Sequence, residues 1–213
     1  MSNLNPDKAL IFRIAHIDCV PWILRHGLHC RNSDDQDPHY VNIGSVELIS
    51  KRSRHVVPIP PGGTLSDYVP FYFTPFSIMM YNIHTGYGGI TRRANKDIVI
   101  LVSSLHRVHK LKLPFVFTNQ HAYAADTDYF SDLADLARID WALLQSRNFK
   151  TDDVDPGKQL RYQAEALVHH QVPLAAIDGI GCHDDMVRQK LESLIAAHGV
   201  TITVKTLPSW YFS

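Results

Sequence analysis

The run Asp-Ile-Val-Ile-Leu-Val-Ser at residues 97–103 constrains the fold of this chain more than any other stretch. Its consecutive apolar residues, rich in valine and isoleucine, predict a strand that is buried on both faces of a sheet. Further strands are predicted at residues 9–16, 68–74, 115–118, 174–180 and 200–204. Helices are predicted between Asp18 and Gly27 and at residues 46–54, 78–83, 158–168 and 186–197. Strands and helices do not alternate regularly, which favours an α+β fold over a doubly wound sheet.

Proline and glycine interrupt this pattern at two places. Residues 57–63, Val-Pro-Ile-Pro-Pro-Gly-Gly, cannot form regular structure, because proline lacks an amide donor and glycine frees the backbone. Pro70 lies inside the strand predicted at residues 68–74, which indicates an edge strand or a bulge. Residues 122–157 show no strand pattern, and an excursion of that length between two strands is usually functional when it is not a linker.

Length and composition describe an ordinary globular protein. The 213 residues suffice for one substantial core, and no shift in composition divides them, so residues 1–213 are expected to form a single domain. No apolar run approaches the roughly 18 residues needed to cross a bilayer. Residues 1–8 lack the basic and apolar regions of a secretory signal. We therefore expect a cytoplasmic monomer that does not associate with membranes.

Cysteine, histidine and charge usage exclude several function classes. Cys19, Cys30 and Cys182 form no CxxC pair, and an odd number argues against a disulfide framework. The 13 histidines do not show the spacing of metal ligands, so no metal is expected. The net charge is zero, and no global field attracts nucleic acid. Basic clusters at residues 51–55 and 106–112 still leave room for a local basic groove.

Glu165 stands out among the carboxylates. Leu160, Ala164 and Leu167 recur at helical spacing, so residues 158–168 are predicted to form a helix with Glu165 directly beside its buried face. A carboxylate in this place is either a surface charge or an acid held in a pocket. The pattern alone favours the surface charge.

Polar residues also gather at the ends of the predicted strands. Arg13 and His16 lie on the first strand, Tyr72 and Ser77 flank a junction between strand and helix, and Arg52 and His121 adjoin loops. Each has an ordinary structural explanation. Together with Glu165 they offer cations, an aromatic face and a carboxylate. This combination suits a substrate with phosphates, a flat ring and a sugar that develops positive charge.

Several segments in order give the chain a resemblance to the DarT family of DNA ADP-ribosyltransferase toxins, in its thymidine-modifying branch. They are residues 11–18, 48–61, 62–75, 113–121 and 162–168 and the terminal Trp210-Tyr-Phe. The resemblance implies an ADP-ribosyltransferase fold, with two packed, mostly antiparallel sheets around an NAD cleft and helical insertions. It further implies transfer of ADP-ribose from NAD+ to thymidine bases in single-stranded DNA, which blocks replication, and a cognate macrodomain antitoxin of the DarG type.

The resemblance also implies roles for individual residues. The catalytic residues would be Glu165, Arg52 and His121. The residues expected to bind NAD+ are Arg13, Ile14, His16, Arg52, Tyr72 and Ser77. Those expected to bind DNA are Lys51, Arg54, His121 and Tyr123, with residues 122–157 helping to hold the strand. The family commonly carries histidine at the position of Arg13, so the resemblance does not decide whether Arg13 contacts ribose or phosphate.

A mechanism follows from these assignments. Breaking the bond between nicotinamide and ribose develops positive charge on the ribose, as in glycosidases, and Glu165 is expected to stabilise that charge. Arg13 and Arg52 are expected at the pyrophosphate, because a guanidinium matches phosphate oxygens, and Tyr72 beside the nicotinamide. Arg52 is expected to stabilise the deprotonated acceptor base, while either His121 or water takes its proton.

Two alternatives remain at this point. The first keeps the fold but changes the acceptor, giving a protein-directed ADP-ribosyltransferase or an NAD glycohydrolase. The second is a non-catalytic nucleic-acid-binding module in which Glu165 is only a surface charge. Mass spectrometry of DNA and protein after incubation with NAD+ tests the first alternative, and an unreactive protein that still binds an oligonucleotide would support the second.

Overall fold

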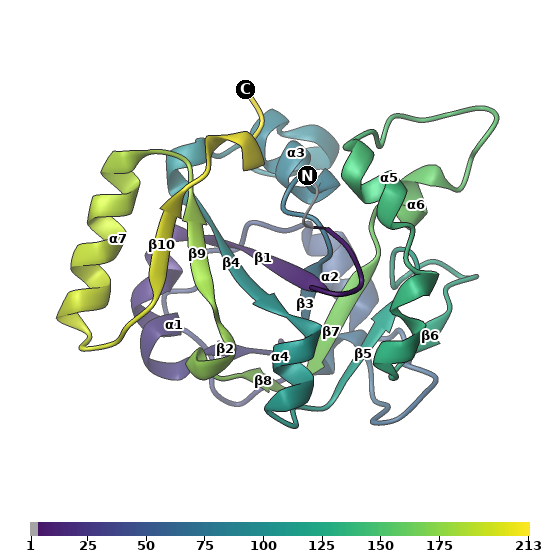
Figure 1. The fold of residues 1–213 in the computed structure, drawn as a ribbon, viewed down its shortest axis with the longest axis horizontal. Coiled ribbons are helices and arrows are strands. Elements are labelled where there is room, and N and C mark those ends of the chain that lie inside the picture. Colours follow the sequence, from purple (N-terminus) through teal and green to yellow (C-terminus); the bar gives the residue numbers. More distant parts are fainter. Residues whose placement is uncertain (1–3) are drawn as a thin grey trace.

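The computed structural model describes residues 4–213, and within them the strand predicted at residues 97–103 lies inside a large sheet. Eight strands pair in the order β10-β9-β4-β1-β3-β7-β5-β6 (Figure 1). In chain order they are β1 (Leu10–His16), β3 (Tyr68–Tyr72), β4 (Ile98–Ser104), β5 (Phe115–Thr118), β6 (Tyr129–Phe130), β7 (Glu165–His169), β9 (Gly179–Cys182) and β10 (Thr203–Thr206). Neighbouring strands are antiparallel except β9 and β10. A separate antiparallel pair joins β2 (Leu28–His29) to β8 (Gln171–Val172).

The sheet has one weak link, between β1 and β3. These strands share the single pair Phe12↔Tyr72, whereas β1 pairs with β4 along its whole length. Beyond this pair the two strands separate, and Nη1 of Arg13 donates a hydrogen bond of 3.0 Å to the carbonyl of Pro70. The link therefore divides the sheet into a half built on β4 and a half built on β7. The predicted α+β class is confirmed, with the two expected sheets joined through one residue pair.

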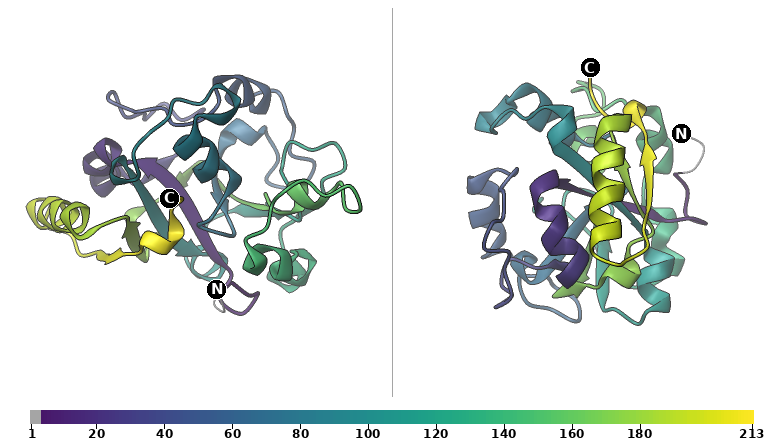
Figure 2. Two further views of the ribbon diagram at one scale, coloured as in Figure 1. Left: turned by 90° about the horizontal axis from the view of Figure 1, so that it is seen from above. Right: turned by 90° about the vertical axis from the view of Figure 1, so that its left-hand side faces the viewer.

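Helices cover the sheet and its ends. They are α1 (Val20–His26), α2 (Val46–Arg52), α3 (Ile78–Thr85), α4 (Leu105–Lys110), α5 (Trp141–Ser146), α6 (Lys158–Arg161) and α7 (Asp185–Ala197). Side-chain caps begin several of them: Ser45 accepts from the amide of Leu48 at α2, and Asp184 caps α7. The longest helix, α7, packs on β9 and β10 at one end of the sheet (Figure 2). Across residues 4–213, no helix combines the length and the apolar character needed to span a bilayer.

Three predictions about local structure were wrong. Residues 158–168 do not form one helix: α6 ends at Arg161, and Glu165 begins β7. The apolar spacing also fits a strand, and pairing with β3 on one side and β5 on the other decides in favour of the strand. Leu160, assigned to the buried face, is 36% exposed. The final strands also begin later than predicted, β9 at Gly179 and β10 at Thr203.

Pro70 does not mark an edge strand, which corrects a fourth prediction. β3 lies between β1 and β7 in the strand order. The carbonyl of Pro70 faces the gap where β1 has separated. It accepts a hydrogen bond from the side chain of Arg13 rather than from a backbone amide of β1. The missing amide of Pro70 therefore costs no ladder hydrogen bond, and a proline is tolerated in an inner strand.

Gly27 provides a test of how the β2–β8 pair is held against α1. Its backbone has φ 79° and ψ −157°, a region open almost only to glycine, and an added Cβ would collide with the carbonyl oxygen of Val172. We expect Gly27→Ala to lower the free energy of unfolding by about 2–3 kcal/mol. Chemical denaturation measures this. Gly88→Ala is the matched control, because its φ is also positive at 67° but the space around it is open; an equal loss in both variants would contradict the collision.

Candidate active site

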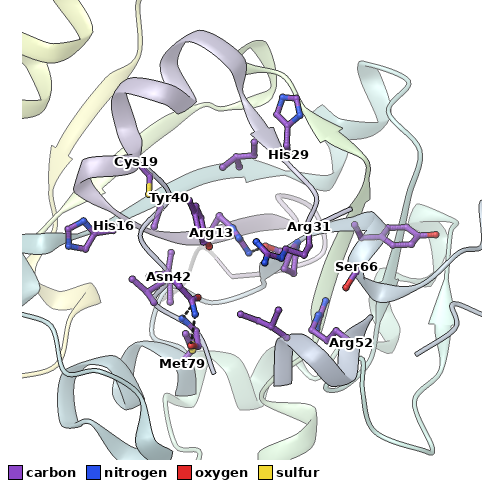
Figure 3. A pocket seen from close by; sticks show the side chains of 18 of the residues that line it. Arg13, His16, Cys19, His29, Arg31, Tyr40, Asn42, Arg52, Ser66 and Met79 are labelled. Atoms are coloured by element: carbon purple, nitrogen blue, oxygen red, sulfur yellow. Dashed lines mark hydrogen bonds between the residues drawn. The ribbon is translucent and has the colours of Figure 1, made fainter. Parts of the chain in front are cut away.

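A cavity of about 390 Å³ lies where β1 and β3 separate (Figure 3). Its walls come from β1, α1, α2, β3 and the long loop between β2 and α2, and both Glu165 and His121 line it. This volume falls in the range of sites that bury small organic ligands. The cavity is therefore the place where the predicted residues must meet if they act together.

Glu165 and Arg52 form a buried ion pair in this cavity. Nη1 of Arg52 lies 2.9 Å from Oε2 and 3.3 Å from Oε1 of Glu165, and the two side chains are only 12% and 4% exposed. The amide of Ala122 donates a further hydrogen bond of 3.1 Å to Oε1. Both carboxylate oxygens are therefore oriented by the protein. The interpretation of Glu165 as a surface charge is wrong, since the residue is 3% exposed.

The surroundings keep Glu165 ionised. Burial by itself raises the pKa of a carboxyl group, but the Arg52 charge, His121 and the amide of Ala122 outweigh it and hold the pKa of Glu165 below its ordinary value. A buried carboxylate with its charge retained can interact with a positive charge in a medium of low dielectric constant. This is the electrostatic element that a reaction with a cationic transition state requires.

Tyr72 is directly opposite Glu165 in the β3–β7 register. Residues directly opposite in an antiparallel pair point to the same face of a sheet, so the phenol ring and the carboxylate share the cavity. Burial, together with the Glu165 charge, raises the pKa of Tyr72 to about 12. The phenol therefore stays protonated and offers a neutral aromatic face.

His121 enters the cavity from the loop after β5, with one ring nitrogen already engaged. The amide of Tyr123 lies 3.2 Å from Nδ1 of His121, and an amide can only donate, so Nδ1 is the acceptor. Burial, together with Arg52 and His55 and against Glu165, lowers the pKa of His121. The neutral ring consequently carries its proton on Nε2 and offers a hydrogen-bond donor.

The residues predicted to bind NAD+ do not all reach the cavity. Arg13, Ile14, His16 and Tyr72 line it together with Arg52. Ser77 is outside the lining, and its hydroxyl accepts the amide of Met80 as the cap of α3, so its position gives it a structural role. Helix capping accounts for a serine at this strand-to-helix junction, and the contact of Ser77 with NAD+ stays a prediction.

The residues predicted to bind DNA gather beside the first cavity. Lys51, Arg54 and Tyr123, together with His55, line a second cavity of about 120 Å³. The rings of His55 and Tyr123 are 5.1 Å apart. Because Lys51 and Arg52 are consecutive on α2, the two cavities adjoin one another at this helix end.

Two further aromatic residues of the 122–157 excursion are occupied by the protein itself. Phe130 stacks on Phe117 at 5.4 Å, and the hydroxyl of Tyr129 donates to the carbonyl of Ala122. The ring of Phe130 and the hydroxyl of Tyr129 are therefore already engaged within the protein. Tyr123 remains the aromatic side chain at the second cavity.

The long loop between β2 and α2 supplies cavity residues that the sequence analysis missed. They are Arg31, Asp35, Gln36, Asp37, Tyr40, Val41, Asn42, Ile43, Gly44 and Ser45. The loop has no hydrophobic periodicity, so only its length and its arginine could have drawn attention to it. No group of three or more metal-ligating side chains occurs among residues 4–213.

The donor set of the cavity fits a dinucleotide. Arg13, Arg31 and Arg52 provide guanidinium groups for a diphosphate, and Tyr72 provides a face for a flat ring. Nη2 of Arg52 is buried and has no hydrogen-bond partner within the described chain, so this guanidinium has donor capacity left over. The fold and this cleft define an enzyme of the ADP-ribosyltransferase class.

Comparisons with known proteins give the family. The family model described as ssDNA thymidine ADP-ribosyltransferase, DarT, matches residues 12–212. A protein of Escherichia coli O127:H6 named DNA ADP-ribosyl transferase is 53% identical over 212 residues, covering 100% of this chain and 97% of its own. The chain therefore belongs to the DarT family. Membership of this family confirms the predicted NAD-dependent DNA ADP-ribosyltransferase activity.

Solved structures agree with this placement. Thermus sp. 2.9 DarT in complex with ADP-ribosylated ssDNA matches with a TM-score of 0.90 and 33% identity, covering 97% of this chain and 98% of that one. The same protein in complex with NAD+ matches with a TM-score of 0.84 and 34% identity over 97% and 99% of the chains. Thermosipho africanus DarTG in complex with ADP-ribose matches at 20% identity with a TM-score of 0.75, covering 95% of this chain and 51% of that one, which shows the shared fold.

The Arg52–Glu165 pair makes a prediction about stability and pH. Because the pKa of Glu165 is lowered in the folded protein, the carboxylate contributes stability above the unfolded pKa of about 4.3, and this is lost as the pH falls through the folded pKa. We expect Glu165→Gln to cost about 2 kcal/mol at pH 7, since it removes a charged hydrogen bond. Urea unfolding of both proteins at pH 7 and pH 3.5 should show the difference shrinking at the lower pH. A difference that is independent of pH would contradict the ion pair.

Proposed function

We propose that residues 1–213 act as a single-domain toxin that transfers ADP-ribose from NAD+ to thymidine bases in single-stranded DNA, with Glu165 as the catalytic carboxylate. The observation that carries the proposal is the buried, ionised Glu165 held by Arg52 inside a cavity of about 390 Å³. The NAD+ and ADP-ribosylated ssDNA complexes of Thermus sp. 2.9 DarT support both substrates.

Glu165 would act by electrostatics. As the bond between nicotinamide and ribose breaks, positive charge develops on the ribose, and a fixed carboxylate in a water-poor cleft stabilises it. Arg52 and the amide of Ala122 set the orientation of Glu165 before substrate enters. Tyr72, opposite Glu165 and uncharged, would face the nicotinamide ring.

Arg52 would have two tasks in the reaction. It positions Glu165 through Nη1, and its unpartnered Nη2 is a donor that can stabilise negative charge on the acceptor base as that base loses its proton. Arg13 would bind NAD+ from the other wall, beside Pro70. Ile14 and His16 would contact the substrate along β1.

The structure favours water over His121 as the acceptor of the proton from thymine. A neutral histidine accepts a proton only on its unprotonated nitrogen, and Nδ1 of His121 is occupied by the amide of Tyr123. The lowered pKa of His121 also makes its ring a weaker base. We therefore assign His121 the role of a hydrogen-bond donor, through Nε2, to the acceptor base or to the ribose.

Single-stranded DNA would cross the end of α2. Lys51 and Arg54 at the second cavity are suited to phosphates, and Tyr123 to a neighbouring base. Lys51 is also paired with Glu47 at 2.6 Å, so Arg54 has the larger charge left for DNA. A neutral protein with few phosphate contacts should bind DNA weakly.

The family suggests the setting in which the enzyme acts. A toxin that modifies DNA requires an antitoxin, and we propose a macrodomain of the DarG type that removes the modification. Thermosipho africanus DarTG, a longer chain of the same fold in complex with ADP-ribose, supports this pairing. A cytoplasmic monomer without membrane association is the form in which such an enzyme meets single-stranded DNA.

Glu165→Gln tests the catalytic assignment, because it keeps the volume of the side chain and removes its charge. We expect transfer to fall by at least about a hundredfold, comparable to the loss of an oxyanion-hole donor, while NAD+ affinity changes little. The measurement is nicotinamide release and the mass of a thymidine-containing oligonucleotide from the same reaction.

The same reaction separates the alternatives. A mass increase of one ADP-ribose on the oligonucleotide supports the proposed function, and nicotinamide release without it indicates an NAD glycohydrolase. A near-normal rate in Glu165→Gln would refute the catalytic role. Glu192→Gln is the matched control, because Glu192 is an exposed carboxylate on α7, paired with Arg188 and outside both cavities, and its loss should leave the rate unchanged.

Arg54→Gln tests the path of the DNA. Removing one cation that neutralises a phosphate of single-stranded DNA reduces the slope of log K against log salt concentration by about 0.7. We expect this reduction for Arg54→Gln, measured by fluorescence anisotropy of a labelled oligonucleotide at several salt concentrations. Arg92→Gln, which changes an exposed arginine away from both cavities, is the control. Equal slopes for Arg54→Gln and wild type would remove the second cavity from the DNA path.

A further inference from the structure

The peptide group between Ala122 and Tyr123 joins two hydrogen bonds into one chain. Its N–H donates to Nδ1 of His121 at 3.2 Å, and its carbonyl oxygen accepts from the hydroxyl of Tyr129 at 2.5 Å. A donor on the carbonyl of a peptide group makes its N–H a better donor, because successive hydrogen bonds polarise one another. The hydroxyl of Tyr129 therefore acts on the imidazole ring of His121 through a single peptide group.

The position of Tyr129 is set by the sheet. Tyr129 lies on β6 directly opposite Thr118 on β5, and residues opposite one another in an antiparallel pair share a face. The hydroxyl of Thr118 accepts the amide of Glu165 at 3.1 Å, so this row of residues continues to the first residue of β7. The ring of Tyr129 packs against a small buried cluster that includes Val116 and Leu167, which pair with one another. The phenol is consequently fixed on the face of the sheet that also carries Glu165.

The backbone around His121 is bonded at each neighbouring position. The amide of His121 donates to the carbonyl of Leu160 at 2.9 Å, and its carbonyl accepts the hydroxyl of Thr127 at 2.8 Å. The amide of Ala122 donates to Glu165 at 3.1 Å. Ala122 is fully buried, so removal of the phenol hydroxyl would leave its carbonyl without a donor, which is costly. The peptide group would then be free to turn toward another donor and away from Nδ1.

The phenol is suited to act as a permanent donor. Burial, together with the charge of Glu165, raises the pKa of Tyr129 to about 12, so its hydroxyl keeps its hydrogen at neutral pH. The histidine that it acts on is neutral, because burial lowers the pKa of His121, and Arg52 and His55 add to this against the charge of Glu165. The chain therefore runs in one direction, from the phenol to the ring.

This chain decides which nitrogen of His121 carries hydrogen. A neutral imidazole has one N–H and one bare nitrogen, and the hydrogen bond at one nitrogen fixes the state of the other. With Nδ1 as acceptor, the hydrogen lies on Nε2, which is the donor assigned above to the acceptor base or the ribose. The opposite tautomer would place two N–H donors face to face, and it would present a bare nitrogen to the substrate.

We propose that Tyr129 is a positioning residue for the transfer reaction: its hydroxyl holds the Ala122–Tyr123 peptide against His121 and thereby keeps the donor hydrogen on Nε2. The proposal rests on the proposed function for the donor role of His121. Tyr129 lines neither cavity, so it acts through His121 and not on a substrate. An aromatic side chain of the 122–157 excursion thus has a task in the chemistry besides any contact with a base.

Tyr129→Phe tests the proposal, because it removes the hydroxyl and keeps the ring. The first measurement is a long-range proton–nitrogen NMR spectrum without substrates. The two ring nitrogens of a histidine give widely separated signals in a single tautomer, and these signals approach one another when the tautomers mix. The chain has 13 histidines, so His121→Gln identifies the signals of His121. We expect hydrogen on Nε2 alone in wild type and a mixture of tautomers in Tyr129→Phe.

The second measurement is turnover with NAD+ and a thymidine-containing oligonucleotide. We expect kcat of Tyr129→Phe to fall about three- to tenfold, the contribution of one hydrogen bond, with the KM for NAD+ unchanged. Tyr211→Phe is the matched control, because its buried hydroxyl lies 3.0 Å from the carbonyl of Ile98 and 3.1 Å from that of Gly181, outside both cavities. This control should change neither kcat nor the signals of His121.

Thr127→Val separates the chain from the general bracing of the loop, because the Thr127 hydroxyl bonds the carbonyl of His121 and not the peptide that follows. We expect the His121 signals of Thr127→Val to match wild type. Three results would overturn the proposal: hydrogen on Nδ1 in wild type, an unchanged tautomer in Tyr129→Phe, or the same mixture in Thr127→Val. Failure of wild type to modify an oligonucleotide would instead contradict the proposed function, and the spectra recorded without substrates would still decide the role of Tyr129.

Discussion

The candidate active site depends on Tyr72, where the two halves of the sheet meet. It pairs with Phe12 on β1 and with Glu165 on β7. Because β1 and β3 separate on the far side of this pair, the sheet itself creates a cleft, and the paired residues place an aromatic ring and a carboxylate at its base. A fully paired sheet would have no room for a substrate at this point. The cleft therefore exists because β1 and β3 are joined by only one residue pair.

The polar groups around the cleft illustrate how a buried charge is maintained. Glu165 is taken out of water, which opposes ionisation, yet one guanidinium nitrogen and one backbone amide reach its oxygens. The same guanidinium keeps a second nitrogen without a partner in the described chain. Protein donors therefore orient the carboxylate and still leave capacity for a ligand, which distinguishes this pair from an ion pair that only supports the fold.

The sequence predicted those features that depend on local chemistry. The buried run at residues 97–103 is β4, and the helices of residues 46–52 and 78–85 begin at serine caps. Glu165 was identified through the family resemblance, but its local structure was not, because its apolar neighbours fit a helix or a strand and only pairing with β3 and β5 decides. Ser77 caps α3, and because a helix cap and a ligand contact look alike in sequence, its contact with NAD+ stays a prediction. Arg31 was missed because an irregular loop has no periodicity to reveal its position.

The separation of Arg52 and Glu165 along the chain has a consequence for synthesis. The two residues are 113 positions apart, and β7 fills the place between β3 and β5 only after most of the chain has been made. A chain interrupted before residue 165 has the arginine but neither the carboxylate nor the strand that carries it. Contacts this distant in sequence form late, after the loops between them have closed. The buried ion pair at the base of the cleft consequently forms only with the completed sheet, and a product of translation that ends before residue 165 contains one half of it.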